Sequence, residues 1–504
     1  MASDAAAAQR AARARSRSDP ATRPGLAAVA LGVAGAAAIA LGGCASSAGI
    51  APVASEIAPA SLGLGAGPPV EATPALADDW WRGFGDAALN ALVDRALAGN
   101  PGLKVAQARL ARAGAALSSA RAADGPQVRG EIDVTRQRFS STGIYPPPLG
   151  GGIFTLGTAQ VGLSWELDFF GRNRAAIEAA VGSQRAALAD AQAARIVLAS
   201  NVARTYMQLG RLFEQREVAT RALRQRSEIL SLIMQRVQGG LDTKVELRQG
   251  EGALPESRQQ IEQLDEQITL SRHALAALTA QAPNALDDLE PRLRTVQAVP
   301  LPAAVPADLL ARRADVTAAR WRVEAAAGDM RRAKSQFYPD VNLAAFVGLS
   351  SIGLDQLVNA ASRQYGAGPA ISLPIFDAGR LRANLSGKAA EVDAAVESYN
   401  GAVIEAVHDV ADQISSLRSL GRQQTEQAGA QAAAESAYEF AMQRYGAGLG
   451  SYLTVLNAET GVLNQRRQAV DLKARVLDTQ IGLARALGGG YTTDAQAGTA
   501  NPAP

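Results

Sequence analysis

Few side chains in this sequence are suited to bond chemistry. The 504 residues include a single cysteine, Cys44, and two histidines, His273 and His408. This composition excludes a disulfide framework and argues against a Cys/His zinc site or a Cys–His catalytic pair. His408 stands beside Asp409 and Asp412, as in a proton relay, but a surface or packed position on a helix is the simpler interpretation.

Sequence motifs for other chemistry are also missing. There is no Gly-x-Ser-x-Gly elbow, and Gly387-Lys388 lacks the remaining residues of a P-loop. No acidic run has the spacing of a calcium loop. We therefore expect a protein that is not an enzyme, binds no metal and takes any energy that it needs from a partner.

The one cysteine follows a segment that is typical of an export signal. A leader that contains Arg10, Arg13, Arg15, Arg17 and Arg23 precedes an apolar run from Leu26 to Leu41, and this run ends in Leu41-Gly42-Gly43-Cys44. The run is too short for a convincing transmembrane helix. We expect residues 1–43 to be a lipoprotein signal peptide and Cys44 to carry a lipid. An ordinary signal peptide with a chance cysteine is the alternative.

Removal of that leader changes the charge of the chain. The whole sequence has a net charge of +2, and residues 1–43 contain five arginines and two aspartates, so the mature chain is slightly acidic. Such a chain has no basic face for nucleic acid. Residues 44–77 are rich in Ala, Ser, Gly and Pro and read as a flexible tether, and residues 491–504 read as a disordered tail.

An internal duplication organises the rest of the chain. Residues 109–128 match residues 322–341, Gly171–Arg174 match Gly379–Arg382, and Met234-Gln235-Arg236 match Met442-Gln443-Arg444 at the same offset of 208. Two equivalent halves follow, at about 78–290 and 300–490.

Each half repeats one order of elements. A helical stretch comes first, at Leu92–Arg121 or Asp308–Gln336, and a β-hairpin follows, at about 127–168 or 340–376. In the first hairpin Val128–Val134 and Gln160–Leu167 alternate between apolar and polar residues. In the second, the strands are expected at Val341–Leu349 and Gly368–Phe376. Four such strands are too few to close a barrel, because small membrane barrels need at least eight.

Very long helices are expected after each hairpin. No proline occurs between Gly171 and Gly239 or between Gly379 and Tyr445, and about 66 residues make a rod of roughly 100 Å. Return helices are predicted at Leu241–Ala280 and Leu449–Leu487, with a kink at Pro255 in the first only. A polar-faced coiled-coil spacer is the plainer interpretation, but a spacer has no need of alternating strands.

Several short segments, spread over residues 78–491, resemble one family. They are Trp80-Trp81 with Phe84 and Asp86, Asn100-Pro101, Arg312-Arg313 with Asp315-Val316, Phe337-Tyr338-Pro339, Arg444-Tyr445 with Gly448 and Tyr452-Leu453, and Ala486–Gly490. Together they are similar to the signature segments of TolC-like outer-membrane efflux lipoproteins, the NodT-type outer membrane factors of tripartite efflux systems. Ala87 and Ala314 stand where this family usually has proline.

The resemblance implies a fold in which a membrane β-barrel continues into a long α-helical barrel. A homotrimer would share a 12-stranded barrel, with four strands from each chain, and would be anchored by N-palmitoyl and S-diacylglycerol groups on Cys44. It also implies an outer-membrane exit duct that passively conducts drugs or other small molecules. The partners would be a periplasmic adaptor and, through it, an RND-type inner-membrane transporter. A duct for type I protein secretion and a lipid-anchored periplasmic structural or enzymatic protein remain alternatives.

The two helix-to-helix turns are the predicted partner-binding ends. They contain Gly240-Leu241 and Gly448-Leu449, where glycine permits the reversal and leucine is an apolar residue that one chain has no evident way to bury. In the resembling family these tips contact the adaptor and the tunnel closes just above them, so Arg236, Arg444 and Tyr445 are candidates for the gate or the contact. Alternatively, glycine only caps the helix and leucine packs internally.

Overall fold

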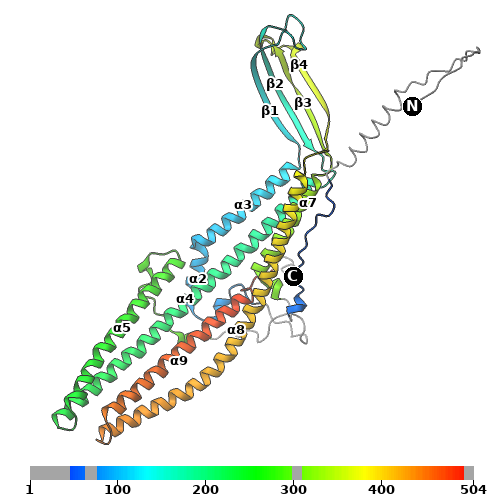
Figure 1. Cartoon of the computed structure of the whole chain (residues 1–504). Coiled ribbons are helices and arrows are strands. Elements are labelled where there is room, and N and C mark those ends of the chain that lie inside the picture. Colours follow the sequence, from blue (N-terminus) through cyan, green and yellow to red (C-terminus); the bar gives the residue numbers. More distant parts are fainter. Residues whose placement is uncertain (1–45, 63–75, 298–308, 493–504) are drawn as a thin grey trace, which may run out of the picture.

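A long helical rod that ends in a small sheet makes up the part of the chain that the structure, a computed structural model, describes (Figure 1). This part comprises residues 46–62, 76–297 and 309–492. The predicted signal peptide, Cys44 and the tail after residue 492 lie outside the described residues.

Two very long helices run the length of the rod. In chain order the helices are α2 (Ala87–Gly99), α3 (Pro101–Ala123), α4 (Arg172–Gln238), α5 (Lys244–Leu278), α6 (Leu309–Arg312), α7 (Ala314–Ser335), α8 (Arg380–Gly446) and α9 (Tyr452–Ala486). At 67 residues each, α4 and α8 measure about 100 Å. The predicted rods are therefore confirmed.

The internal duplication is visible in the bounds of these helices. Helices α4 and α8 begin and end 208 residues apart, and the return helices α5 and α9, of 35 residues each, do the same. Helix α5 continues through Pro255 without a break. Each residue of one hairpin therefore has a structural counterpart in the other.

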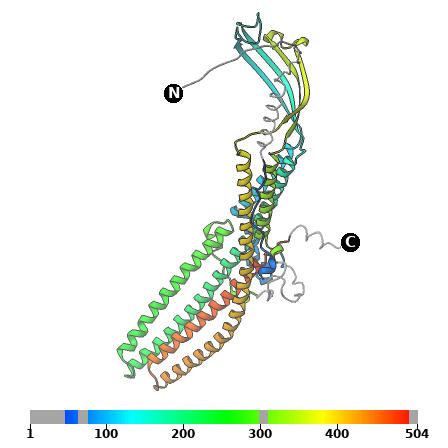
Figure 2. The same ribbon diagram turned by 45° about the vertical axis from the view of Figure 1, so that its right-hand side comes forward.

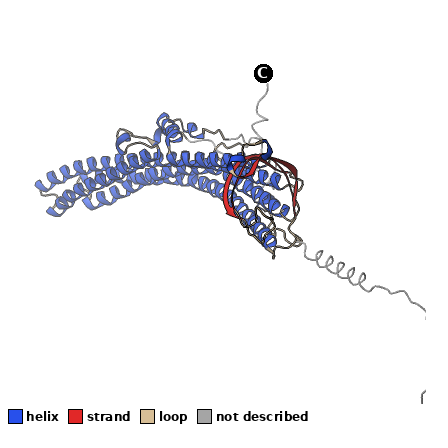
Figure 3. Cartoon of the chain, turned by 90° about the horizontal axis from the view of Figure 1, so that it is seen from above, coloured by secondary structure: helices blue, strands red, loops and turns tan. Residues whose placement is uncertain are grey.

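The sheet has four antiparallel strands in sequence order. They are β1 (Gln127–Arg138), β2 (Ile153–Glu166), β3 (Asp340–Ile352) and β4 (Arg363–Ser372). Strand β2 pairs with β1 in the first half of the chain and with β3 in the second, so the two halves join through this sheet. The sheet is curved when the molecule is seen from above (Figure 3).

The helices form one layer in which neighbours change along the rod. Near the sheet the order is α3, α4, α7, α8, and toward the far end it is α5, α4, α9, α8 (Figures 1 and 2). The sheet order β1 to β4 runs the same way. The layer therefore has two free edges within one chain. One edge is formed by β1, α3 and α5, and the other by β4 and α8.

The main core lies where α2 and the turn before it pack on α4. Trp81 and Tyr206 expose 2% and 1% of their surface. Asp86 caps α2 by accepting hydrogen bonds from two backbone N–H groups, and its second oxygen accepts one from the Tyr206 hydroxyl at 2.7 Å. The signature segment with the two tryptophans, Phe84 and Asp86 therefore serves this core.

The run Gly488–Gly490 is required by close backbone contacts. All three residues have positive φ, and a Cβ atom at Gly488 would lie 1.8 Å from the carbonyl oxygen of Arg312. Only glycine fits such a position.

Some predicted boundaries were wrong. The stretch Leu92–Arg121 is two helices, because Asn100 caps α3 and Pro101 occupies its first position. The other stretch, Asp308–Gln336, is interrupted at Arg313, whose buried side chain pairs with Asp315.

Strand boundaries also differ from the predicted ones. Strand β4 is Arg363–Ser372, so it begins five residues before the predicted Gly368 and ends before Pro374. Strand β2 begins at Ile153, and the predicted run Gln160–Leu167 covers only its second half. Glycine and threonine obscure the alternation in the missed parts.

Part of the predicted tether is anchored to α8. Oδ1 of Asp393 accepts hydrogen bonds from the backbone N–H groups of Val53 and Ala54, both at 2.8 Å. Asn400 accepts one from the backbone N–H of Ile57 at 2.8 Å and donates one to the carbonyl of Ser55 at 3.0 Å. Residues 46–62 therefore lie along α8 and depart from the expected flexibility there.

Candidate functional site: the sheet and the helical tips

One face of the sheet is apolar across all four strands. The strand register aligns Val128 with Leu163, Leu163 with Ala345, and Ala345 with Ala367. The same face carries Ile132, which is 80% exposed, and Val161, which is 49% exposed. Large apolar side chains left uncovered on one continuous face indicate an apolar surrounding or a partner.

The opposite face is polar and is connected by hydrogen bonds. Gln160 donates to Glu131 at 3.0 Å and accepts from Gln364 at 3.2 Å, so one row of side chains crosses from β1 to β4. Ser164 and Asn342 are hydrogen-bonded, with donor–acceptor distances of 3.1 Å and 2.9 Å. The sheet therefore separates an apolar surface from a hydrogen-bonding one.

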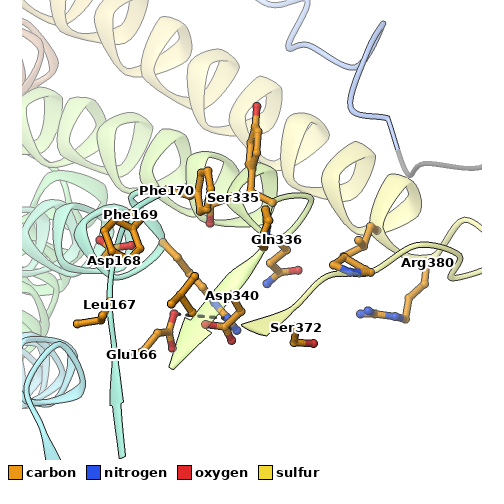
Figure 4. Close-up of a pocket in the computed structure, with 16 residues that line it drawn as sticks. Glu166, Leu167, Asp168, Phe169, Phe170, Ser335, Gln336, Asp340, Ser372 and Arg380 are labelled. Carbon is orange, nitrogen blue, oxygen red and sulfur yellow. Dashed lines mark hydrogen bonds and ion pairs between the residues drawn. The ribbon is translucent and has the colours of Figure 1, made fainter. Parts of the chain in front are cut away.

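A charged cavity marks the junction between strands and helices. It has a volume of about 320 Å³, and Figure 4 shows Glu166 from β2 and Asp340 from β3 directed toward one another. Arg172, the first residue of α4, bridges them at 3.5 and 3.2 Å. Phe170 and Tyr338 stack beside it, with ring centroids 5.2 Å apart. These contacts fix the angle at which the rod leaves the sheet.

The two turns at the far end of the rod have matching geometry. Gly240 and Gly448 adopt φ of 75° and 76°. The backbone N–H of Leu241 donates to the carbonyl of Arg236, and that of Leu449 to the carbonyl of Arg444, both at 2.8 Å. These are helix-terminating turns in which glycine takes the left-handed position.

The leucines after these glycines do not pack internally. Leu241 is 68% exposed and Leu449 is 70% exposed, and Val245 and Leu453, one helical turn further on, are also exposed. Each tip therefore carries a pair of uncovered aliphatic side chains. Glycine does cap the helix, as the alternative expected, but leucine remains available for a contact.

A group of three side chains, the tip lock, joins the two hairpins. It consists of Arg236, Asp242 and Tyr445. The Arg236 guanidinium pairs with the Asp242 carboxylate at 2.9 Å, donates to the Tyr445 carbonyl at 2.9 Å and lies 4.4 Å from the centre of the Tyr445 ring. The Tyr445 hydroxyl donates to Asp242. The structure thus brings together Arg236 and Tyr445, two of the three residues that the sequence offered as candidates for the gate or the tip contact.

The ionisation of Asp242 follows from these contacts. Burial raises its pKa, but hydrogen bonds from Arg236 and Tyr445, together with the positive charge of Arg236, outweigh burial, so the pKa lies below its usual value. Burial and the hydrogen bond to Asp242 raise the pKa of Tyr445. At neutral pH the lock therefore contains a carboxylate, a guanidinium and a neutral phenol.

Sequence reasoning missed Asp242 and grouped Arg444 too closely with the others. Arg444 donates to the carbonyl of Leu449 at 3.2 Å, within its own turn, and stands apart from the tip lock. The only sequence signal for Asp242 is its place just after the first tip, six residues from Arg236.

The proton relay considered for His408 does not form. Its Nδ1 lies 2.9 Å from the carbonyl of Ile404 in the same helix, and Asp409 pairs with Arg313 and Arg485 at 3.4 and 3.0 Å. Within the described residues no group of His, Cys, Asp and Glu is arranged to hold a metal ion. No helix in that part of the chain has the length and hydropathy needed to cross a membrane.

Comparisons with known proteins agree with this geometry. The model of the family described as outer membrane efflux protein matches twice, at residues 92–281 and 305–489. The multidrug resistance outer membrane protein MdtQ of Escherichia coli O6:H1 is 34% identical over 424 residues, which cover 82% of this chain and 88% of MdtQ. The fusaric acid resistance protein FusA of Burkholderia cepacia is 38% identical over 320 residues, 63% of this chain and 60% of FusA.

A solved structure has the same fold. The outer membrane protein VceC of Vibrio cholerae superposes with a TM-score of 0.78 at 35% identity, and the match covers 82% of this chain and 99% of VceC. The outer-membrane channel OprN superposes with a TM-score of 0.78 at 26% identity.

Proposed function

The chain belongs to the outer membrane efflux protein family, and on that premise we propose that three copies form the passive exit duct of a tripartite efflux pump. Its location is the outer membrane and its role is transport in efflux. The trimer, the closed barrel, the lipid anchor and the partners are the parts of this proposal.

The two-faced, open sheet carries the proposal. Strands β1 and β4 end the sheet with unpaired edges, and lipid tolerates no such edge. Pairing β1 of one copy with β4 of the next removes every edge when three copies close a ring of 12 strands. Such a barrel is wide enough for a water-filled lumen. The apolar face would contact lipid, and the row from Glu131 to Gln364 would line the lumen.

The helices would continue this barrel as a tunnel. The helical layer is open on the same two sides as the sheet, so the ring that closes the strands also closes the helices. With two equivalent halves per chain, the tunnel would have approximate sixfold symmetry. It would extend about 100 Å into the periplasm.

We further propose that a lipid on Cys44 anchors each chain and that an adaptor docks on the tips. Leu241, Val245, Leu449 and Leu453 provide the apolar contact, and Gly240 and Gly448 shape it. Arg236 and Tyr445 position the tips, and Arg444 is the gate candidate. Through the adaptor the duct would serve an RND-type transporter, without enzymatic activity of its own.

Small molecules are the favoured cargo. The relatives named for resistance to drugs and to fusaric acid support this over type I protein secretion and over a periplasmic structural role. No nucleic acid partner is proposed.

Purified protein in planar lipid bilayers tests the proposal. Heat-modifiable trimers that conduct ions, and that restore drug resistance to cells without their own duct, are the expected result. A monomer that does not conduct and is released from membranes when the lipid is removed would refute it.

A further inference from the structure

Two arginines interrupt the apolar face of the sheet at its far end. Strand residues two apart share a face, so Arg136 and Arg138 lie on the face that carries Val128 and Ile132. Arg138 is the last residue of β1. The connections between the strands of each hairpin lie at the end of the sheet that points away from the helices (Figure 1). In the duct proposed above, this end faces the outside of the cell.

Strand β4 brings a third arginine to the same face. Arg363 is the first residue of β4 and lies four residues from Ala367 of the apolar face. Tyr365 lies between them on that face and is 83% exposed. Arg136, Arg138 and Arg363, here called the cationic patch, are exposed, and within the described residues none of their side chains has a hydrogen bond or an ion pair.

The cationic patch has no carboxylate beside it on the apolar face. The β1–β2 connection, residues 139–152, contains no charged residue. The β3–β4 connection, residues 353–362, contains only Asp355, which belongs to a turn that packs on β2 and β3. The acidic residues of β1, Glu131 and Asp133, lie on the opposite, polar face. The charge of the patch is therefore not balanced within the described part of the chain.

The internal repeat gives the register of the strand pair between copies. The two hairpins have equivalent pairing, since Gln127 pairs with Ser164 and Asp340 pairs with Ser372. Strand β3 therefore repeats β1 at an offset of 213 residues, and β4 repeats β2 at an offset of 208. In the closed ring, β4 of one copy and β1 of the next form the β4–β1 seam, which corresponds to the β2–β3 seam within a copy.

This register gathers the three arginines at the β4–β1 seam. Shifted by the two offsets, the pairing of β2 with β3 places Tyr365 opposite Arg138 of the next copy. Arg363 is then the diagonal neighbour of Arg138, and Arg136 is two residues away from it on the same strand. Diagonal neighbours across a strand pair are about 7–8 Å apart, within reach of long side chains. The patch is therefore complete only where two copies meet.

The equivalent place within a copy is uncharged. The four counterparts at the β2–β3 seam are Thr155, Gly157, Leu349 and Ser351. This place is also covered, because a Cβ atom at Gly157 would lie 2.8 Å from the side chain of Leu354 and 3.3 Å from that of Leu357. The charge thus distinguishes the three seams between copies from the three within them.

The cationic patch lies at the outer border of the apolar band. On β1 the apolar positions from Val128 to Val134 span about 20 Å, close to the roughly 25 Å band of outer-membrane barrels, and Arg136 follows directly. Arginine on the lipid-facing side is unfavourable at the bilayer midplane but costs little near the headgroups. An exposed phenol such as that of Tyr365 also suits the headgroup level.

We propose that each β4–β1 seam binds the phosphorylated headgroup of a lipid in the outer leaflet, with the acyl chains along the apolar face. Guanidinium groups bind phosphate through paired, charge-assisted hydrogen bonds. In an outer membrane the phosphorylated lipid of this leaflet is lipid A, and its phosphates supply the negative charge that the patch lacks. A lipid bound there contacts two copies and stabilises the trimer. The inference rests on the trimeric barrel proposed above.

Native mass spectrometry of the purified, lipidated trimer tests the site. Trimers in detergent without divalent cations are titrated with lipid A that carries two phosphates, and with lipid A that has the same acyl chains and no phosphate. We expect up to three molecules of the bisphosphorylated lipid per trimer and much weaker binding of the other. Inorganic phosphate at millimolar concentration should not displace the lipid.

Variants of the cationic patch identify the groups that bind. Arg136→Gln, Arg138→Gln and Arg363→Gln are combined, and the affinity should fall about 100-fold, because each arginine near an anionic lipid surface contributes a factor of about five. The corresponding triple lysine variant should keep most of the affinity. Arg129→Gln is the matched control and should bind as the wild type does, because Arg129 is an exposed arginine without a partner on the polar face of β1.

The temperature at which trimers dissociate on gels gives a second readout. Without lipid, the wild type and all variants should dissociate alike, and bisphosphorylated lipid A should stabilise the wild type and Arg129→Gln but not the triple glutamine variant. Equal binding of phosphate-free lipid A, displacement by inorganic phosphate, or unchanged binding in the triple glutamine variant would each overturn the inference. A wild type that forms no trimers would refute the shared barrel as well.

A cross-link tests whether the patch forms between copies. Arg138→Cys with Tyr365→Cys should join neighbouring chains through a short bismaleimide. Arg129→Cys with Tyr365→Cys should not, because position 129 lies nine residues further along β1. Heat-stable trimers in which Arg138→Cys and Tyr365→Cys fail to join chains would show that the patch is not assembled at the seam and would contradict the proposed site.

Discussion

Asp242 illustrates how one residue can join distant parts of the chain. Its carboxylate accepts from Arg236 of α4 and from Tyr445 of α8, which are six and 203 residues away. All three side chains are largely buried, although they lie at the far end of the rod. A local effect on the tips is therefore expected when this residue changes.

Asp242→Asn should loosen both tips without dissolving the trimer. Losing charge-assisted hydrogen bonds from Arg236 and Tyr445 should cost about 2 kcal/mol of local stability. Hydrogen exchange of the peptides that contain the two turns measures this. Asp265→Asn, which removes an exposed partner of Arg216, is the matched control and should change little. Equal protection of the tips in both variants would exclude the lock.

The same residue predicts how the tips respond to acid. Because the folded-state pKa of Asp242 is lowered, its contribution is complete above the ordinary value near 4 and is lost as pH falls through the lower value. Tip protection, corrected for intrinsic exchange rates, should be constant from pH 7 to about pH 4 and fall below it. The asparagine variant should lose most of this dependence. The pH dependence that remains should come from Glu246, whose pKa is lowered by the hydrogen bond from the Thr243 hydroxyl.

At the scale of elements, strand β2 tests which face contacts lipid. Val161 and Gln160 are neighbours near the middle of the strand, on the apolar and the polar face. Val161→Lys should cost about 2–4 kcal/mol if it lies near the bilayer midplane, and Gln160→Lys far less. Refolding into lipid vesicles, followed by urea unfolding, compares them. Equal losses would mean that the face or the depth is wrongly assigned.

Helices α4 and α7 depend on glycine for their close approach. A Cβ atom at Gly182 would lie 2.9 Å from the backbone nitrogen of Ala325, and one at Gly328 would lie 2.8 Å from that of Ala179. Gly182→Ala should lower trimer stability by about 1–3 kcal/mol, because two backbones must move apart.

Gly421→Ala is the control, because a Cβ atom there meets no other atom. It gains the same helix propensity, about 1 kcal/mol, and should be neutral or stabilising. Thermal dissociation of trimers on gels is the measurement. A stabilised Gly182→Ala trimer would contradict the close approach.

The sequence predicted the elements well, because periodicity and internal repetition are local signals. The ends of α4 and α8 lie within one residue of the predicted ends. The sequence did not predict that residues 46–62 pack on α8. Asp393 and Asn400 are some 340 residues away, and they bind backbone atoms, which every residue type has, so no sequence pattern marks the contact. Of the tip lock, the sequence predicted Arg236 and Tyr445 but not Asp242, because only the arginine and the tyrosine belong to recognisable segments.

At the scale of the whole molecule, the tips are where the duct must meet a partner, and their leucines can be changed without disturbing the fold. Leu241 and Leu449 are largely exposed, so replacing both with glutamate should change folding stability by no more than about 0.5 kcal/mol each. Each leucine covered by a partner contributes about 1.5–3 kcal/mol, which the double variant would lose twice. We expect heat-stable trimers in the outer membrane that no longer confer drug resistance. Val358→Glu, a change at an even more exposed apolar residue in the β3–β4 connection, should keep full resistance. Cysteines at positions 241 and 449 should also cross-link to an adaptor, whereas one at 358 should not. Full resistance in the double glutamate variant would remove these leucines from the docking surface.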